Sequence, residues 1–164
     1  LGIDCRVPAL PRAEDPILAE WTVEIDRLAP DGHTVLVGHS RGGVAILRWL
    51  EMQPVGQRVK AVILIATNSG HSEKMSKSEN SKTFFSDAGY DFESIKAHCD
   101  TFIVFHSRDD QTVPFEAGEE NTKGLNARFL RFNDRAHFGR TISSIPELID
   151  EISKLNNSDT KRTS

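Results

Sequence analysis

An α/β architecture, with a mostly parallel central sheet and helices on both faces, is the fold class that the sequence predicts. Strand-like and helix-like segments alternate along the chain, which is the pattern of parallel strands joined by helical crossovers. Two strand-like segments, Ala61–Ala66 and Phe102–Phe105, are apolar at every position, as expected of parallel strands covered by helices on both sides. The 164 residues suffice for one hydrophobic core.

The expected elements follow one another in a regular order. Strands are predicted over Gly2–Val7, Thr34–Gly38, Ala61–Ala66, Thr101–His106 and Ala127–Phe132. Helices are predicted over Pro16–Leu28, Val44–Met52, Phe92–Cys99, Phe115–Thr122 and Ile145–Leu155. The first of these helices carries Ile17, Leu18, Trp21, Ile25 and Leu28 at helical spacing. Residues 1–155 are therefore expected to form a single domain.

Two segments lie outside this alternation. Thr67–Gly89 is polar, rich in serine and lysine, and too long for a tight connection, so we expect an excursion or lid there. The polar tail, residues 156–164, is predicted to be disordered.

Composition and charge exclude several classes of function. Hydrophobic residues make up 38% and charged residues 27%, a globular balance rather than a disordered one. The formal net charge of −4 argues against binding to nucleic acid or anionic membranes. No apolar run is long enough to cross a bilayer and no signal peptide opens the chain. Cys5 and Cys99 are too isolated for a disulfide framework or a zinc cluster, so the cytoplasm is the expected compartment.

The sequence VLVGHSRGG, residues 35–43, contains the pattern G-x-S-x-G between an expected strand and an expected helix. In a nucleophile elbow, this context holds the serine, here Ser40, in a sharp turn that exposes its hydroxyl. Gly38 and Gly42 would let strand and helix approach closely, and the backbone N–H of Arg41 would lie at the helix start, where it can stabilise an oxyanion. The alternative is a glycine-rich helix start with Ser40 as an ordinary N-cap.

A serine nucleophile needs a histidine base oriented by an acid, and on this architecture both follow the serine in the chain. The loop HSRDDQTVP after the fourth expected strand offers Asp109 and Asp110. The loop NDRAHF after the fifth offers His137. Because sites on open α/β sheets form at the carboxyl ends of the strands, these loops are expected to converge on Ser40.

These three motifs resemble the small α/β-hydrolase-fold serine hydrolases related to retinoblastoma-binding protein 9 and its bacterial relatives, and the likeness extends to about Leu155. The resemblance implies a three-layer α/β-hydrolase fold. It implies that the acid belongs to a D-x-x-[VL]-P segment, which selects Asp110, and that the base belongs to a D-x-x-H-F segment, which selects His137. Ser40 is then the nucleophile, and no cofactor or metal is implied.

The beginning of the chain departs from that family. The family starts with a strand, a loop bearing a second oxyanion donor, and a helix, all before the segment that corresponds to Gly2. We therefore expect this chain to be N-terminally incomplete by about 30 residues or more. Loss of one oxyanion donor costs on the order of 10²–10³ in turnover, so full activity of the chain is in doubt.

Other suggestive residues have simpler interpretations. Residues 74–78 spell KMSKS, the phosphate-binding loop of class I aminoacyl-tRNA synthetases, but its partner motif is missing and the match is an accident of a polar segment. The histidines show no metal-ligand spacing, and His39 is expected to line the mouth of the pocket. Cys99 is expected to be buried rather than a thiol nucleophile.

Two hypotheses of different classes follow. The first is a serine hydrolase that cleaves a small ester or related acyl substrate through an acyl-enzyme. The second is a catalytically silent interaction module that keeps the fold, although the sequence itself indicates no protein partner.

Overall fold

The core of the molecule is a four-stranded parallel sheet with the strand order β1-β2-β3-β4. The computed structural model describes residues 2–71, 78–139 and 142–160. The strands are β1 (Val35–His39), β2 (Ala61–Ile65), β3 (Phe102–Ser107) and β4 (Arg128–Phe132). Every residue of β2 and β3 is buried, which explains why these two strands are apolar almost throughout.

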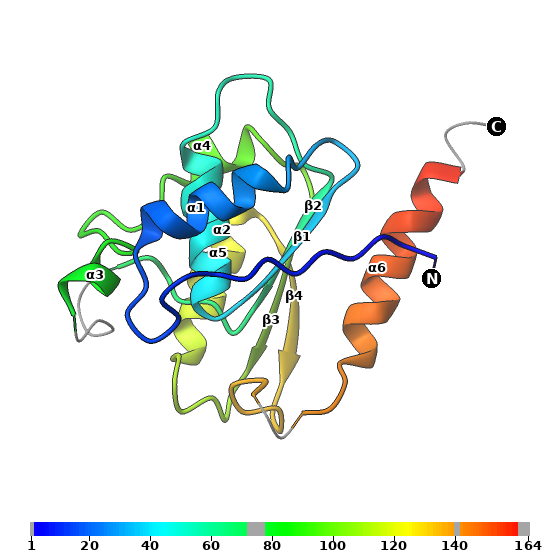
Figure 1. The fold of residues 1–164 in the computed structure, drawn as a ribbon. Coiled ribbons are helices and arrows are strands. Elements are labelled where there is room, and N and C mark those ends of the chain that lie inside the picture. Colours follow the sequence, from blue (N-terminus) through cyan, green and yellow to red (C-terminus); the bar gives the residue numbers. More distant parts are fainter. Residues whose placement is uncertain (1, 72–77, 140–141, 161–164) are drawn as a thin grey trace.

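Helices cover both faces of the sheet, as the sequence predicts (Figure 1). They are α1 (Leu18–Arg27), α2 (Arg41–Glu51), α3 (Glu79–Lys82), α4 (Phe92–Lys96), α5 (Phe115–Leu125) and α6 (Pro146–Thr160). One face packs against α1, α2, α4 and α5, in a core that contains Trp49, Leu64 and Val104. The other face packs against α6 through Ile63 and Phe105. Alternate residues of one strand thus enter different cores, which gives three layers.

The structure confirms the last four predicted strands and all five predicted helices. Most of their ends lie within a few residues of the predicted ones. The prediction of a strand over Gly2–Val7 is wrong, because these residues pair with no strand. A strand needs a hydrogen-bonded neighbour, and β1 pairs only with β2 within the described residues. Ile3 and Val7 are accordingly exposed.

Helical structure extends into the two segments that the sequence analysis set apart. The polar stretch after β2 contains the short helix α3, whose N-cap Ser78 accepts a hydrogen bond from the Ser81 N–H. Helix α6 continues to Thr160, so residues 156–160 are helical rather than a disordered tail. The apolar residues Ile152 and Leu155 anchor the preceding turns of that helix against the sheet.

Candidate active site

Ser40 lies in the turn between β1 and α2 in a backbone conformation that only glycine adopts easily. Its φ is 52° and its ψ is −123°, and its N–H donates to the carbonyl of Ile65 at 2.8 Å. The Ser40 side chain makes no N-cap hydrogen bond, so the alternative of an ordinary capping serine is wrong. Strain of this kind persists only where the surroundings enforce it, and such positions cluster at functional sites.

Close contact between β1 and α2 depends on two glycines. A β-carbon on Gly38 would lie 2.5 Å from Cα of Gly43, and one on Gly43 would lie 2.1 Å from Oγ1 of Thr67. Gly42, which the motif had suggested as the second close-packing glycine, has nothing within 4 Å of its β position. The close approach therefore involves the residue after the motif, because Gly43 and not Gly42 faces the sheet.

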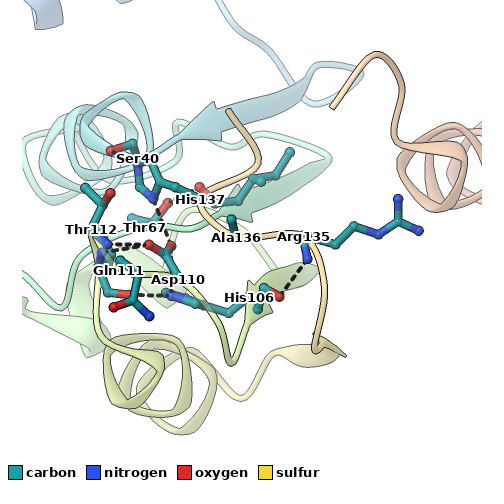
Figure 2. A network of polar contacts seen from close by, with 12 residues as sticks. Ser40, Thr67, His106, Asp110, Gln111, Thr112, Arg135, Ala136 and His137 are labelled. Atoms are coloured by element: carbon teal, nitrogen blue, oxygen red, sulfur yellow. Dashed lines mark hydrogen bonds and ion pairs between the residues drawn. The ribbon is translucent and has the colours of Figure 1, made fainter. Parts of the chain in front are cut away.

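The structure brings Ser40, His137 and Asp110 together in one hydrogen-bonded chain (Figure 2). Ser40 Oγ lies 3.0 Å from Nε2 of His137, and Nδ1 of His137 lies 2.8 Å from Oδ2 of Asp110. The carboxylate accepts the Nδ1 proton, which leaves Nε2 as the acceptor for the Ser40 hydroxyl. This is the tautomer in which an imidazole can take a proton from the serine.

The Asp110 carboxylate is fully enclosed but completely hydrogen-bonded. Its side chain is 0% exposed, and its Oδ1 accepts the backbone N–H groups of Thr112 and Val113 at 2.8 and 3.0 Å. The two N–H bonds fix the direction of Oδ2 toward His137. A buried, fully satisfied carboxylate is what orientation of an imidazole requires.

The neighbouring aspartate has a different position. Asp109 accepts a hydrogen bond from the Ser107 hydroxyl and another from the Ala136 N–H at 2.9 Å, and these bonds lower the pKa of its carboxyl. Ser107 Oγ in turn accepts the N–H of Arg135 at 3.1 Å. Asp109 and Ser107 therefore hold the backbone of the loop that carries His137, a role that no spacing pattern in the sequence indicated.

His39 contacts the same loop from the other side. Its Nε2 donates to the carbonyl oxygen of His137 at 2.7 Å, and the two rings lie 4.8 Å apart. Burial lowers the pKa of His39, so the ring is neutral at pH 7. It lines the cavity beside Ser40, as the sequence predicts, and it also fixes the backbone of His137, which the sequence analysis missed.

His106 is a second histidine that the sequence analysis left without a role. It is 0% exposed, its Nε2 donates to the Val113 carbonyl at 3.1 Å, and that nitrogen lies 3.6 Å from Oδ2 of Asp110. Gly118 makes room for the ring, because a β-carbon there would lie 2.6 Å from Nδ1. The position of His106 directly after the apolar run Phe102–Phe105 was the one signal in the sequence that could have drawn attention to it.

The backbone N–H of Arg41 is the first of α2 and directly follows Ser40. A donor in the first turn of a helix has no intrahelical acceptor, so this group is free to bind a ligand. A cavity of about 390 Å³ lies beside it and is lined by His39, Ser40 and Arg41 among others. A larger cavity of about 480 Å³ runs along α1 and contains none of the residues discussed above.

Cys99, which the sequence analysis discounted as a nucleophile, does not line the cavity beside Ser40. Burial raises the pKa of the Cys99 thiol to about 11, which makes it a poor nucleophile. The residues that the structure describes contain no cluster of His, Cys, Asp or Glu able to hold a metal ion. Within the same residues, no helix is long and apolar enough to span a bilayer. Of the KMSKS stretch, residues 74–77 lie outside the described residues.

Comparison with known proteins gives a consistent picture. The family model described as serine hydrolase matches residues 5–144. Serine hydrolase RBBP9 of Rattus norvegicus is 31% identical over 144 residues, which cover 85% of this chain and 72% of the rat protein. The crystal structure of the ydeN gene product of B. subtilis superposes with a TM-score of 0.78 at 22% identity, covering 90% of this chain and 80% of that one. The esterase RhEst1 from Rhodococcus sp. ECU1013 shares the fold, with a TM-score of 0.56 at 14% identity over 86% of this chain and 72% of that one.

Proposed function

Because the chain belongs to the serine hydrolase family, we propose that it cleaves a small ester or related acyl substrate through a covalent acyl-enzyme. Ser40 is the nucleophile, His137 the general base and then the general acid, and Asp110 the group that orients His137. The observation that supports these roles is the hydrogen-bonded chain from Asp110 through His137 to Ser40 Oγ.

The first half of the reaction forms the acyl-enzyme. Ser40 Oγ attacks the substrate carbonyl carbon while its proton moves to Nε2 of His137. The new C–O bond places negative charge on the carbonyl oxygen, where the Arg41 N–H donates a hydrogen bond. The bond to the alkoxy group then breaks, and His137 returns the proton to the leaving alcohol.

The second half releases the acid. A water molecule gives a proton to His137 and forms a bond to the acyl carbon, and the bond to Ser40 breaks as the serine regains its proton. The cycle consumes one ester and one water and returns the enzyme unchanged. Proton transfer by a positioned base contributes about 10²–10⁴-fold to the rate of such steps.

Covalent labelling with a fluorophosphonate probe tests the proposal. The wild-type protein should be labelled at one serine and Ser40→Ala should not, while Ser153→Ala on α6 serves as the matched control and should be labelled like the wild type. Equal labelling of wild type and Ser40→Ala would disprove the assignment of the nucleophile. A folded wild type that reacts neither with the probe nor with p-nitrophenyl acetate would favour the silent interaction module.

A further inference from the structure

Arg41 is one of the residues that line the cavity beside Ser40. Apolar side chains from Ala13, Trp21 and Val113 form part of its lining, and Asn68 and Thr112 add uncharged polar groups. Among the lining residues that the structure describes, Arg41 alone carries a full charge, because burial keeps the neighbouring His39 neutral. The substrate cavity of the proposed hydrolase thus combines apolar surface with a single guanidinium group.

That guanidinium makes no hydrogen bond or ion pair with the residues that the structure describes. Arg41 is half-buried, and its Nε is shielded from solvent and makes no hydrogen bond to any of them. Its guanidinium carbon lies 5.7 Å from the ring centre of Phe84. Burial lowers the pKa of Arg41, but an arginine stays protonated in any protein environment, so the charge persists.

A second arginine on the same helix shows what a satisfied guanidinium looks like here. Arg48 pairs with Glu51 at 2.8 Å and donates to the carbonyl oxygens of Phe84 and Gly70. Its side chain is only 11% exposed, and each of its three guanidinium nitrogens donates to an acceptor. Arg41, two turns earlier, has no such set of acceptors within the described part of the chain.

Asp15, whose charge acts on Arg41, does not fill this role. Its negative charge opposes the lowering of the Arg41 pKa by burial, but the ion pairs among the described residues include none between the two side chains. Its carboxylate oxygens accept hydrogen bonds from Ser78 Oγ and from Asn80 Nδ2. This negative charge repels a doubly charged ligand such as a phosphate more strongly than a singly charged carboxylate.

We infer that the Arg41 side chain binds a carboxylate of the substrate, so that the preferred substrates are esters whose acyl chain ends in a carboxylate. The inference rests on the proposed function, because it specifies the substrate class of the same site. The planar guanidinium matches a carboxylate in a two-point hydrogen-bonded pair, and the apolar lining accommodates the methylene chain between the two ends of the substrate.

Matched ester pairs test this substrate class. Monomethyl adipate and methyl hexanoate differ only in whether the chain ends in a carboxylate or a methyl group, and monomethyl succinate with methyl butanoate gives a shorter pair. Hydrolysis is followed by proton release for the wild type, Arg41→Gln, Arg41→Lys and the control Arg27→Gln. The control removes the same charge from the end of α1, outside this cavity.

We expect the wild type to hydrolyse the better anionic ester with a kcat/KM about 10- to 100-fold above that of its neutral partner. Arg41→Gln should remove this preference mainly through KM, because the charge lies away from the reacting carbonyl. Arg41→Lys should restore part of it, and Arg27→Gln should keep it. No anionic preference in either pair, or a preference that survives in Arg41→Gln, would overturn the inference.

Binding to an inactive protein separates this inference from the proposed function. Monomethyl adipate is titrated into Ser40→Ala and into the double variant Ser40→Ala/Arg41→Gln and followed by calorimetry. Binding that is weakened at least about tenfold in the double variant supports the carboxylate site even if no ester is turned over. Equal binding, or none in either protein, refutes the site even if fluorophosphonate labels Ser40.

Discussion

Asp110→Asn should cost far more activity than Asp109→Asn, although the two aspartates are adjacent in the chain. The Oδ1 atom of the introduced asparagine can still accept the N–H groups of Thr112 and Val113. Its NH₂ group then faces Nδ1 of His137, where a donor now meets a donor. The imidazole responds by moving its proton to Nε2, which can no longer accept the proton of Ser40.

The magnitude follows from that change of tautomer. In a serine hydrolase triad, exchange of the carboxylate for an amide lowers kcat by about 10⁴, which corresponds to about 5 kcal/mol of activation free energy. Asp109→Asn weakens only the hydrogen bonds from Ser107 and Ala136 that hold the loop. Such a bond contributes about 1 kcal/mol, so we expect about a tenfold loss or less.

Steady-state hydrolysis of p-nitrophenyl acetate by the wild type and both variants measures the difference. Urea unfolding of each protein checks that the fold is retained. The reasoning is refuted if Asp110→Asn keeps more than about a tenth of the wild-type kcat, or if Asp109→Asn loses more activity than Asp110→Asn.

Three further predictions concern stability and reactivity. Gly38→Ala should lower the unfolding free energy by about 1–3 kcal/mol, because the added β-carbon meets the backbone of α2. Gly42→Ala should be neutral or stabilising, because nothing lies within 4 Å of its β position. Equal thermal midpoints for the two variants would contradict this prediction. Burial lowers the pKa of His106 in the folded protein. Below about pH 6.5 the unfolded chain therefore binds more protons than the folded one, and the unfolding free energy falls as the pH drops. His106→Gln should flatten that fall between about pH 7 and pH 5.5, and an unchanged slope in urea titrations would speak against it. Iodoacetamide should modify the exposed Cys5 in the native protein and the buried Cys99 only after unfolding. Peptide mapping by mass spectrometry measures both reactions. Modification of Cys99 in the native protein would contradict the prediction.

The fold was predictable from the sequence where a pattern has one physical meaning. A run such as Ala61–Ile65 is apolar throughout because parallel strands are buried on both faces. The strand over Gly2–Val7 could not be judged in this way, since a strand also depends on a neighbour that its own residues do not encode. The hydrophobic pattern of the sequence therefore predicted the buried strands. It wrongly predicted a strand over Gly2–Val7, which has no neighbouring strand among the described residues.

The site shows the same division. The order of Ser40, Asp110 and His137 along the chain, each following a strand, was enough to predict that they meet. The contacts that orient His137 were not predictable, because His39 and Asp109 reach its loop across tight turns whose geometry depends on the whole fold. Side chains that act on backbone groups leave no spacing pattern in a sequence.

The central claim is that Ser40 Oγ forms a covalent bond to the substrate with His137 as its base. The most direct measurement is the mass of the intact protein after mixing with p-nitrophenyl acetate and quenching in acid, followed by peptide mapping. We predict one added acetyl group on the peptide that contains Ser40, and none in Ser40→Ala or His137→Ala. An acetyl group on a different residue, or Ser40-independent turnover without any adduct, would contradict the claim.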